Sequence, residues 1–343
     1  MDQLNVSDFF WGQAGRVLLD VRTPAEFAQG HIPGARNLPL FSDEERAVVG
    51  TIYKQENPDR AFQKGLDFAG AKMSWYVAEA KRLAPGNKVV IHCWRGGKRS
   101  SSMGWLLGFT GFEVEILLGG YKAYRRYILH ELEMRDARLL ILGGKTGSGK
   151  TDILKQLVAM GEQVIDLEEL AHHKGSAFGD LGQAPQPSVE QFENNLFEAF
   201  SHLHPAERIW LENESQSIGH VFLPAVFWKK MRASPLIHLE VPFEKRVQKL
   251  VGEYGNFSTE QLQAAFEKIK KRLGGQHLKT ALEALEKKDL ATAAGLALNY
   301  YDKSYDHATS KGQFCKKLTF AAKEKDSFEI AKKLIKLADE HHF

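Results

Sequence analysis

Cysteine is scarce in this sequence: Cys93 and Cys315 are its only thiols among 343 residues. Two cysteines cannot form the disulfide framework that is typical of small secreted domains. Long apolar runs are absent too, since none approaches the roughly 18 residues that a membrane-spanning helix needs, and the first residues have no signal-peptide pattern. We therefore expect a cytoplasmic protein with no membrane partner and with at least one thiol that is free for chemistry.

The chain as a whole carries a net charge of only +3, which is too small to predict a general nucleic-acid binder. Its C-terminal part is the basic part: from Ala264 onward there are 16 Lys and Arg residues against 11 Asp and Glu residues. The first basic cluster of this part consists of Lys268, Lys270, Lys271 and Arg272. From charge alone, this cluster is either a solvated helix face or a contact for RNA phosphates.

The composition is that of a folded α/β protein. With 43% apolar and 26% charged residues and no repeats or low-complexity tracts, the sequence excludes disordered, collagen-like and solenoid proteins. Apolar strand patterns alternate with helical patterns, which predicts parallel sheets. The predicted strands are residues 16–21, 88–92, 114–118, 139–142, 164–167, 209–211 and 236–241.

These patterns divide the chain into three sections. We place the first boundary near residue 135, where a charged helical stretch ends before a new strand, so that residues 1–135 form the first domain. A second α/β domain covers residues 136–257. Residues 258–343 have a helical pattern to the end, with apolar residues at helical spacing on one face: Leu262, Ala265, Phe266 and Ile269.

Cys93 follows the predicted strand 88–92 directly and opens a glycine-containing loop before a helix. Backbone N–H groups at such a strand-to-helix turn can point at one centre, and the positive end of the helix favours an anion there. The residues expected to bind an anion are Arg95, Gly96, Gly97, Lys98 and Arg99. We therefore predict that Cys93 is a nucleophile with a lowered pKa. Cys315 has no such surroundings and is expected to be structural.

A second loop carries a full phosphate-binding motif. Its residues are Gly144, Lys145, Thr146, Gly147, Ser148, Gly149, Lys150 and Thr151. The predicted strand before it and helix after it are the context that a P-loop requires. The backbone would wrap a diphosphate, Lys150 would supply a positive charge, and the Thr151 hydroxyl would suit Mg²⁺. The motif predicts a diphosphate or polyphosphate ligand more firmly than it predicts hydrolysis of ATP.

Two polar stretches supply candidates for acid–base work or for aligning Mg²⁺. A P-loop enzyme usually has an acidic residue at the end of a later strand. The candidates are Asp166, His172, His173, Glu212 and Glu214. No zinc or other resident metal is expected, because adjacent histidines on a helix cannot both face one ion and no third ligand lies nearby.

The first domain resembles the rhodanese family. The resemblance is carried by the position of Cys93 and by three motifs: Asp20-Val21-Arg22-Thr23-Pro24-Ala25-Glu26-Phe27, Gly30-His31-Ile32-Pro33-Gly34-Ala35 and Asn37-Leu38-Pro39. The resemblance implies that Cys93 carries sulfur or selenium as a persulfide-type adduct, and that Asp20, Arg22, Glu26 and His31 hold the fold. Trp94 stands where many sulfurtransferases have arginine, which argues against ordinary thiosulfate-to-cyanide transfer.

The chain thus combines a rhodanese-like domain, a P-loop NTPase-like parallel-sheet domain and a helical C-terminal section. This combination is similar to the tRNA 2-selenouridine synthase family, and so are three shorter stretches, residues 45–51, 172–176 and 212–215. The resemblance implies S-geranylation of wobble 2-thiouridine in tRNA from geranyl diphosphate, followed by selenation from selenophosphate with selenium carried on Cys93. It implies no permanently bound cofactor, with Mg²⁺ as an optional companion of the diphosphate. The partners implied are tRNA, held by the basic C-terminal section, and a selenophosphate-producing enzyme.

Two other functions are compatible with the residues alone. One is a P-loop kinase or NTPase regulated by a rhodanese module, without RNA. The other is a cysteine phosphatase, because some phosphatases share the rhodanese fold and the stretch from Cys93 to Arg99 is long enough to admit a phosphate. The site of a geranyl chain is left open by the sequence, since the aromatic candidates have the spacing of core residues: Trp210, Phe222, Phe227 and Trp228.

Overall fold

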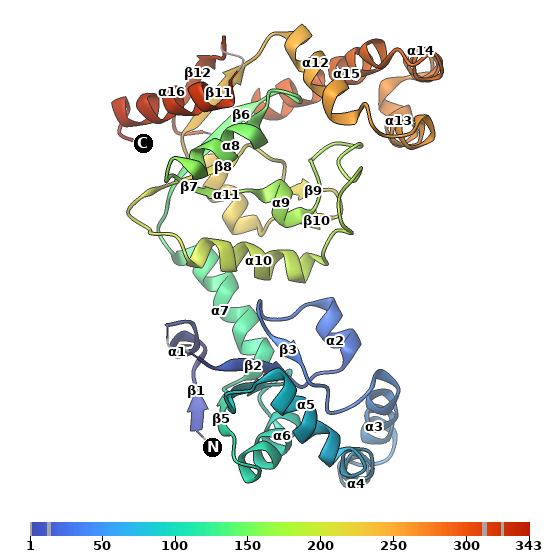
Figure 1. Cartoon of the computed structure of the whole chain (residues 1–343), viewed down its shortest axis with the longest axis vertical. Helices are drawn as coiled ribbons and strands as arrows, with labels where there is room; N and C mark the ends of the chain where they lie inside the picture. Colours follow the sequence, from blue (N-terminus) through green and yellow to red (C-terminus); the bar gives the residue numbers. More distant parts are fainter. Residues whose placement is uncertain (1, 12–14, 311–313, 324–325) are drawn as a thin grey trace. The chain divides into compact units, whose positions relative to one another are not determined.

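The computed structural model describes residues 2–11, 15–310, 314–323 and 326–343. By its contacts the chain divides into two compact units, Met1–Leu132 and Glu133–Phe343. Figure 1 shows the elements of both units. Each unit contains its own five-stranded parallel sheet, so the α/β class with parallel sheets that the sequence predicts is confirmed.

The sheet of the first unit has the strand order β1-β5-β4-β2-β3. Its central strand β4 is an apolar run whose last four residues are buried, as expected for a parallel strand covered on both faces. Cys93 therefore stands at the carboxyl end of the middle of the sheet. The strands are β1 (Asp2–Leu4), β2 (Val17–Asp20), β3 (Arg36–Asn37), β4 (Lys88–His92) and β5 (Glu113–Leu117).

The helices of the first unit pack on this sheet over a core that includes Leu19, Ile91 and Leu107. Two of them begin with a capping box, in which the N-cap residue and the glutamate three positions later satisfy each other's backbone N–H groups: Thr23 with Glu26, and Ser42 with Glu45. The helices are α1 (Val6–Trp11), α2 (Pro24–Gln29), α3 (Asp43–Gln55), α4 (Pro58–Gly70), α5 (Met73–Leu83), α6 (Lys98–Phe109) and α7 (Gly120–Met134).

The sheet of the second unit has the order β12-β11-β6-β8-β7. Strand β6 lies in its middle and pairs with β8 in parallel, so that Leu142 is opposite Glu212. The carboxyl ends of both strands thus lie side by side. The strands of the sheet are β6 (Arg138–Gly144), β7 (Gln163–Ile165), β8 (Arg208–Glu212), β11 (Leu236–Glu240) and β12 (Lys317–Ala321), and a separate hairpin is formed by β9 (Ser217–Ile218) and β10 (Val221–Phe222).

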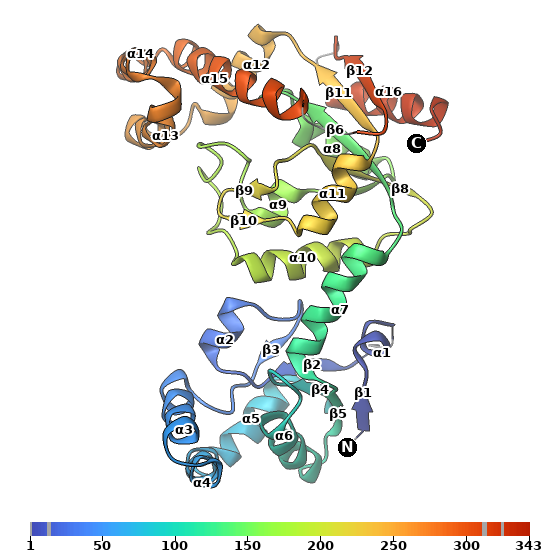
Figure 2. The ribbon, with the colours of Figure 1, turned by 180° about the vertical axis from the view of Figure 1, so that it is seen from behind.

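Helices α8 and α16 cover one face of this sheet, and α11 lies on the other, as a comparison of Figures 1 and 2 shows. Residues Leu154 and Leu334 from the two covering helices share one core with Leu140 of β6. The helices that surround the sheet are α8 (Lys150–Ala159), α9 (Leu167–Ala171), α10 (Val189–Ser201), α11 (Ala225–Ala233) and α16 (Ser327–Glu340).

The C-terminal region is helical, as the sequence predicts. The predicted apolar face is buried in a core shared by three helices. The helices of this region before the last strand are α12 (Phe243–Tyr254), α13 (Thr259–Leu273), α14 (Gly275–Glu286) and α15 (Leu290–Ser310). In the described part of the chain, no helix has the length and apolar character needed to cross a membrane.

The prediction that residues 258–343 are helical to the end is wrong at one place. Residues Lys317–Ala321 form β12, which pairs in parallel with β11 at the edge of the second sheet. This strand alternates between exposed and half-buried residues, as an edge strand does. Because it is short and follows a basic pair, its pattern on the sequence is weak, and the pairing with β11 decides its structure.

Candidate active sites: a thiol loop and a phosphate loop

The thiol loop, residues 93–99, lies tightly against the start of α7. Cys93 O accepts a hydrogen bond from Tyr121 N at 2.9 Å. Gly96 and Gly120 both have φ in the left-handed region, at 65° and 57°. A Cβ on Gly120 would lie 2.2 Å from Cys93 O, and one on Gly96 would lie 2.8 Å from Leu117 O. Both positions require glycine, which explains why the loop follows one defined path.

The Cys93 thiol is buried and surrounded by hydrogen-bond donors. Its Sγ lies 3.3 Å from Ser100 Oγ, whose single hydroxyl proton can be donated either to Sγ or to Gly97 O, 3.0 Å away. Burial raises the pKa of the Cys93 thiol, but hydrogen bonds from the Ser100 hydroxyl and from backbone N–H groups outweigh it, and the Arg99 charge adds to them. The pKa therefore lies below the ordinary value of a thiol, which favours the nucleophilic thiolate.

The three cations of the loop have different surroundings. Arg99 forms an ion pair with Glu26, with Nη1 to Oε2 at 2.6 Å. The ammonium of Lys98 lies 4.4 Å from the centre of the Phe62 ring. Arg95 is exposed, although its backbone N–H contributes to the thiolate site. The pairing of Arg99 with Glu26 was not predicted, because Glu26 belongs to a motif whose residues are expected to hold the fold.

Asp20 and Arg22 form a fully buried pair at the end of β2. Arg22 Nη2 donates to Asp20 Oδ2 at 2.6 Å and to Gly30 O at 2.7 Å, and the guanidinium lies 3.8 Å from the centre of the Tyr121 ring. These contacts tie the first strands of the unit to the residues that follow the thiol loop. The pair is thus buried and hydrogen-bonded within the fold, as expected for motif residues that hold the fold.

The phosphate loop, residues 144–151, joins β6 to α8. Gly147 and Gly149 have φ values of 77° and 84°, which lets successive N–H groups turn toward one centre. Lys150 Nζ donates to Gly144 O at 3.2 Å. Among the described residues, the buried Ser148 Oγ has no hydrogen-bond partner. Together with the N-terminus of α8, this arrangement is a site for an anion of the size of a diphosphate.

Helices α12 and α15 hold the phosphate loop from outside. Arg246 of α12 is buried, donates to Thr146 O at 3.2 Å and pairs with Asp302 of α15 at 2.7 Å. Gly144 N donates to Tyr305 Oη at 2.9 Å. Sequence reasoning missed these supports, since they come from positions about a hundred residues or more along the chain with no motif of their own.

Lys145 does not face the centre of the loop. Its ammonium pairs with Asp306 at 2.9 Å and lies 3.9 Å from Asp302, so two carboxylates of α15 already balance its charge. Lys150 is therefore the lysine of the loop that is placed to meet a bound phosphate.

A buried carboxylate stands beside the phosphate loop at the end of β8. Glu212 Oε1 accepts from Glu168 N at 2.8 Å, whereas Glu212 Oε2 has no hydrogen-bond partner among the described residues. Burial raises the pKa of Glu212 well above its ordinary value, and the nearby charge of Asp166 adds to the effect. An acidic side chain at the end of the strand next to a P-loop strand is where such enzymes align Mg²⁺.

Glu168 and Glu214 form a hydrogen-bonded pair of carboxyl groups. Burial and the charge of Glu214 raise the pKa of Glu168 to about 8, although Lys150 lowers it. Burial raises the pKa of Glu214 as well. Conversely, burial lowers the pKa of the Lys150 ammonium, but these carboxylates outweigh it and the pKa lies above its usual value. Both carboxyl groups therefore hold a proton more strongly than exposed carboxyl groups do.

The remaining candidates of this cluster have local roles in their loops. Asp166 is the N-cap of α9 and accepts from Glu169 N at 2.8 Å. His172 Nδ1 lies 2.9 Å from Pro185 O, and His173 Nδ1 accepts from Gly175 N at 3.2 Å. Burial lowers the pKa of His173. The structure thus gathers Lys150, Glu168, Glu212 and Glu214 and gives both histidines backbone partners.

The donor set beside the phosphate loop fits Mg²⁺ together with a diphosphate. In the part of the chain that the structure describes, no three His, Cys, Asp or Glu side chains meet around one point. Thr151 Oγ1 lies 3.4 Å from Glu168 Oε2, and the backbone N–H of Glu168 donates a hydrogen bond to Glu212 Oε1. Mg²⁺ is usually bound by one or two carboxylates plus substrate phosphates, which is what these oxygens allow.

The basic cluster that begins the C-terminal section lies on α13, and its four residues are exposed. Lys268 pairs with Asp180 at 2.7 Å and Lys270 with Glu267 at 3.3 Å, which reduces the cluster's free charge. A second surface rich in basic residues is a groove of about 750 Å³ beside the phosphate loop, whose lining also contains Glu240 and Asp306. Its basic lining is Lys145, Lys245, Arg246, Lys317 and Lys323.

These two loops define a class: a rhodanese-like thiol domain joined to a domain with a P-loop. Residues 10–127 match the model of the rhodanese-like domain, and residues 137–336 match the model described as the tRNA 2-selenouridine synthase AAA domain. The chain belongs to the tRNA 2-selenouridine synthase family. The expected resemblance is thereby confirmed.

Individual relatives support the assignment over most of the chain. The tRNA 2-selenouridine synthase of Sulfurovum sp. is 37% identical over 325 residues, which are 84% of this chain and 88% of that protein. The enzyme of the same name from Shewanella denitrificans is 35% identical over 333 residues, 87% of this chain and 89% of that protein. That of Bdellovibrio bacteriovorus is 41% identical over 246 residues, 69% and 64% of the two chains.

Proposed function

We propose that this protein converts wobble 2-thiouridine of tRNA to 2-selenouridine in two reactions, S-geranylation from geranyl diphosphate and then selenation from selenophosphate. The observation that carries the proposal is the presence of two chemically different sites in one chain: a buried thiol beside the Ser100 hydroxyl, and a phosphate loop with a half-buried lysine. Membership of the family supports tRNA as the substrate.

The first reaction is assigned to the phosphate loop. The sulfur of 2-thiouridine attacks C1 of geranyl diphosphate, a C–S bond forms and the C1–O bond breaks. The departing diphosphate carries the developing negative charge, which the loop N–H groups and Lys150 are placed to stabilise. Mg²⁺ at Thr151 and Glu212 would neutralise the same charge.

S-alkylation of 2-thiouridine also releases the proton of N3, because the ring then holds a C2=N3 double bond. A base with a pKa near neutrality is suited to accept it. The Glu168–Glu214 pair, beside Lys150 and with a Glu168 pKa of about 8, meets this requirement. We therefore assign the pair as the base of the first reaction.

The second reaction is assigned to the thiol loop. The selenium of selenophosphate attacks C2, the C2–S bond breaks and geranylthiolate leaves. Water then attacks the phosphorus, so that the P–Se bond breaks, phosphate departs and 2-selenouridine remains without any net oxidation. Geranylation makes the sulfur a better leaving group, which explains why it comes first. Cys93, a thiolate among N–H donors, is the nucleophilic group that we assign to this reaction.

The tRNA is proposed to lie on basic surfaces of the C-terminal region. The exposed cluster on α13 and the groove beside the phosphate loop both offer charge to RNA phosphates. The groove lies directly at Lys145 of the phosphate loop, so RNA held there would be close to the site of the first reaction.

The test is the nucleoside content of a 2-thiouridine-containing tRNA after incubation with the purified protein. With geranyl diphosphate alone we expect S-geranyl-2-thiouridine, and with selenophosphate added we expect 2-selenouridine. ATP hydrolysis is measured in parallel without RNA. Rapid hydrolysis together with unchanged thiouridine would replace the proposal with the P-loop kinase or NTPase that the sequence also admits.

A further inference from the structure

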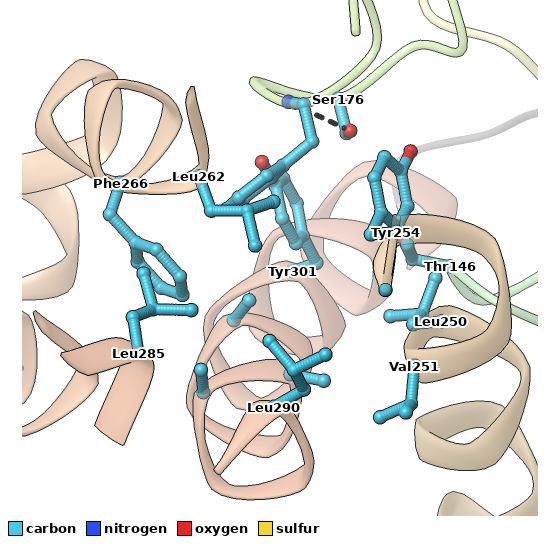
Figure 3. A pocket seen from close by; sticks show the side chains of 15 residues that line it. Thr146, Ser176, Leu250, Val251, Tyr254, Leu262, Phe266, Leu285, Leu290 and Tyr301 are labelled. Atoms are coloured by element: carbon cyan, nitrogen blue, oxygen red, sulfur yellow. Dashed lines mark hydrogen bonds between the residues drawn. The ribbon is translucent and has the colours of Figure 1, made fainter. Parts of the chain in front are cut away.

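An apolar pocket lies between helices α12, α13, α14 and α15, next to the phosphate loop. Figure 3 shows its lining, in which Leu262, Phe266, Leu285 and Leu290 surround the space together with two tyrosine rings. The pocket has a cavity volume of about 60 Å³. It is therefore a narrow slot.

Small residues on the helices create this space. Ala293, Ala294 and Ala297 come from the same side of α15 and all line the pocket, as does Gly255 at the end of α12. Each provides at most a methyl group where a larger side chain would fill the slot. Because well-packed interiors contain few voids larger than water, an apolar space of this extent beside a reaction site is suited to an apolar ligand.

The pocket is continuous with the phosphate loop. Thr146, a residue of that loop, belongs to its lining. A Cβ on the neighbouring Gly147 would lie 3.3 Å from Cγ of Leu250, which lines the pocket from α12. In Figure 3 the hydroxyl groups of Ser176, Tyr254 and Tyr301 gather at one side, whereas Leu285 and Leu290 lie at the opposite side. The slot thus has hydroxyl groups on one side and apolar side chains on the other.

We propose that this pocket binds the isoprenoid chain of the diphosphate substrate and limits its length. The inference rests on the proposed function, which supplies the substrate. With the diphosphate in the phosphate loop, the attached chain would enter past Thr146 between α12 and α15 and end against Leu285 and Leu290. Each methylene that is buried in this way improves binding by a factor of about four.

The test compares two substitutions of alanine on α15. Ala294→Phe fills the pocket, whereas Ala291→Phe makes the same change at an exposed position of the same helix. The ligands are geranyl S-thiolodiphosphate, which does not react, and inorganic diphosphate. We expect Ala294→Phe to weaken binding of the geranyl compound by at least about 10-fold, which corresponds to the loss of two buried methylenes. Its affinity for diphosphate should stay within about 2-fold of that of the wild type. Ala291→Phe should bind both ligands like the wild type.

Equal affinity of both variants for the geranyl compound would overturn the proposal. If Ala294→Phe does not fold, Leu290→Ala decides, because it lengthens the slot: the affinity for farnesyl relative to geranyl thiolodiphosphate should rise several-fold, and an unchanged ratio would overturn the proposal. Failure of the wild type to geranylate thiouridine-containing tRNA would instead refute the proposed function. The two failures are therefore distinguishable.

Discussion

Single residues determine the reactivity of the thiol loop. Cys93 would have a raised pKa from burial alone, and the hydrogen bond from Ser100 is the largest effect that opposes burial. A serine at the first turn of α6 has no special sequence signature, so its role emerges only from the 3.3 Å distance between the two side chains. The glycines that let the loop approach α7 act at the same scale.

The Ser100→Ala substitution should raise the pKa of Cys93. The thiolate is the reactive form, so the rise of its alkylation rate with pH should move to higher pH. The measurement is the rate of reaction with iodoacetamide between pH 5 and 10 in a Cys315→Ser background, which leaves Cys93 as the only thiol. Ser101→Ala, at the neighbouring exposed position, is the matched control. An unshifted profile for Ser100→Ala would show that the hydroxyl does not set the pKa.

If the Glu168–Glu214 pair is the base of the proposed first reaction, the rate of that reaction should depend on pH. The raised pKa of Glu168, about 8, means that the pair gives up its shared proton as the pH rises through this value. Geranyl transfer should therefore increase with pH up to about 8 and level off above. Glu168→Gln should remove this dependence and lower the rate by about 10²-fold or more, whereas Glu169→Gln on the exposed side of α9 should do neither. A wild-type rate that is independent of pH would contradict the assignment.

At the scale of elements, the sequence was most informative for the buried strands. Strands β4, β6, β8 and β11 were predicted to within one or two residues, since a parallel strand covered on both faces is a continuous apolar run. The edge strand β12 gave no such signal. Helix α15 lies in the section that was predicted to be helical, but the contacts of α12 and α15 with the phosphate loop were not predicted, because the register between distant helices is set by tertiary packing.

The Arg246–Asp302 pair between α12 and α15 should be important for stability. Arg246→Ala leaves the half-buried Asp302 with Lys145, 3.9 Å away, as its remaining cation, and removes hydrogen bonds between charged groups that contribute about 1.5–3 kcal/mol to the unfolding free energy. We expect a loss of this size for Arg246→Ala in urea denaturation of the full chain. Lys279→Ala, which breaks an exposed pair with Glu283 on α14, should cost about 0.5 kcal/mol or less. Equal effects of the two variants would contradict this stabilising role of the Arg246–Asp302 pair.

The two basic surfaces can be separated by the salt dependence of tRNA binding. Each phosphate contact that is lost lowers the slope of log affinity against log salt concentration by about 0.7 to 0.9. We expect a lower slope when the groove loses charge at Lys245, Lys317 and Lys323. The slope should fall less for neutralisation of the α13 cluster, since Lys268 and Lys270 already have acidic partners. Slopes equal to wild type for both variants would exclude both surfaces.

At the scale of the whole molecule, the two reaction sites belong to units with separate cores. Both loops could be predicted from the sequence because each is a continuous motif between a strand and a helix. The rest of the phosphate site could not be predicted in this way: Tyr305 bonds Gly144 from 161 residues away, and the apolar pocket is built from four helices. A site whose residues are adjacent in the sequence can be predicted from the sequence, whereas a site whose residues meet only through packing can be recognised only in the folded structure.

The central claim is that two sites carry out two successive reactions, and the nucleosides formed by Cys93→Ser and Lys150→Ala test it most directly. Cys93→Ser should accumulate S-geranyl-2-thiouridine without 2-selenouridine. Lys150→Ala should geranylate at least about 10²-fold more slowly, because it loses the charge that stabilises the departing diphosphate, yet it should selenate RNA that is supplied already geranylated. Loss of both reactions in Cys93→Ser, or no benefit of pre-geranylated RNA to Lys150→Ala, would contradict the account.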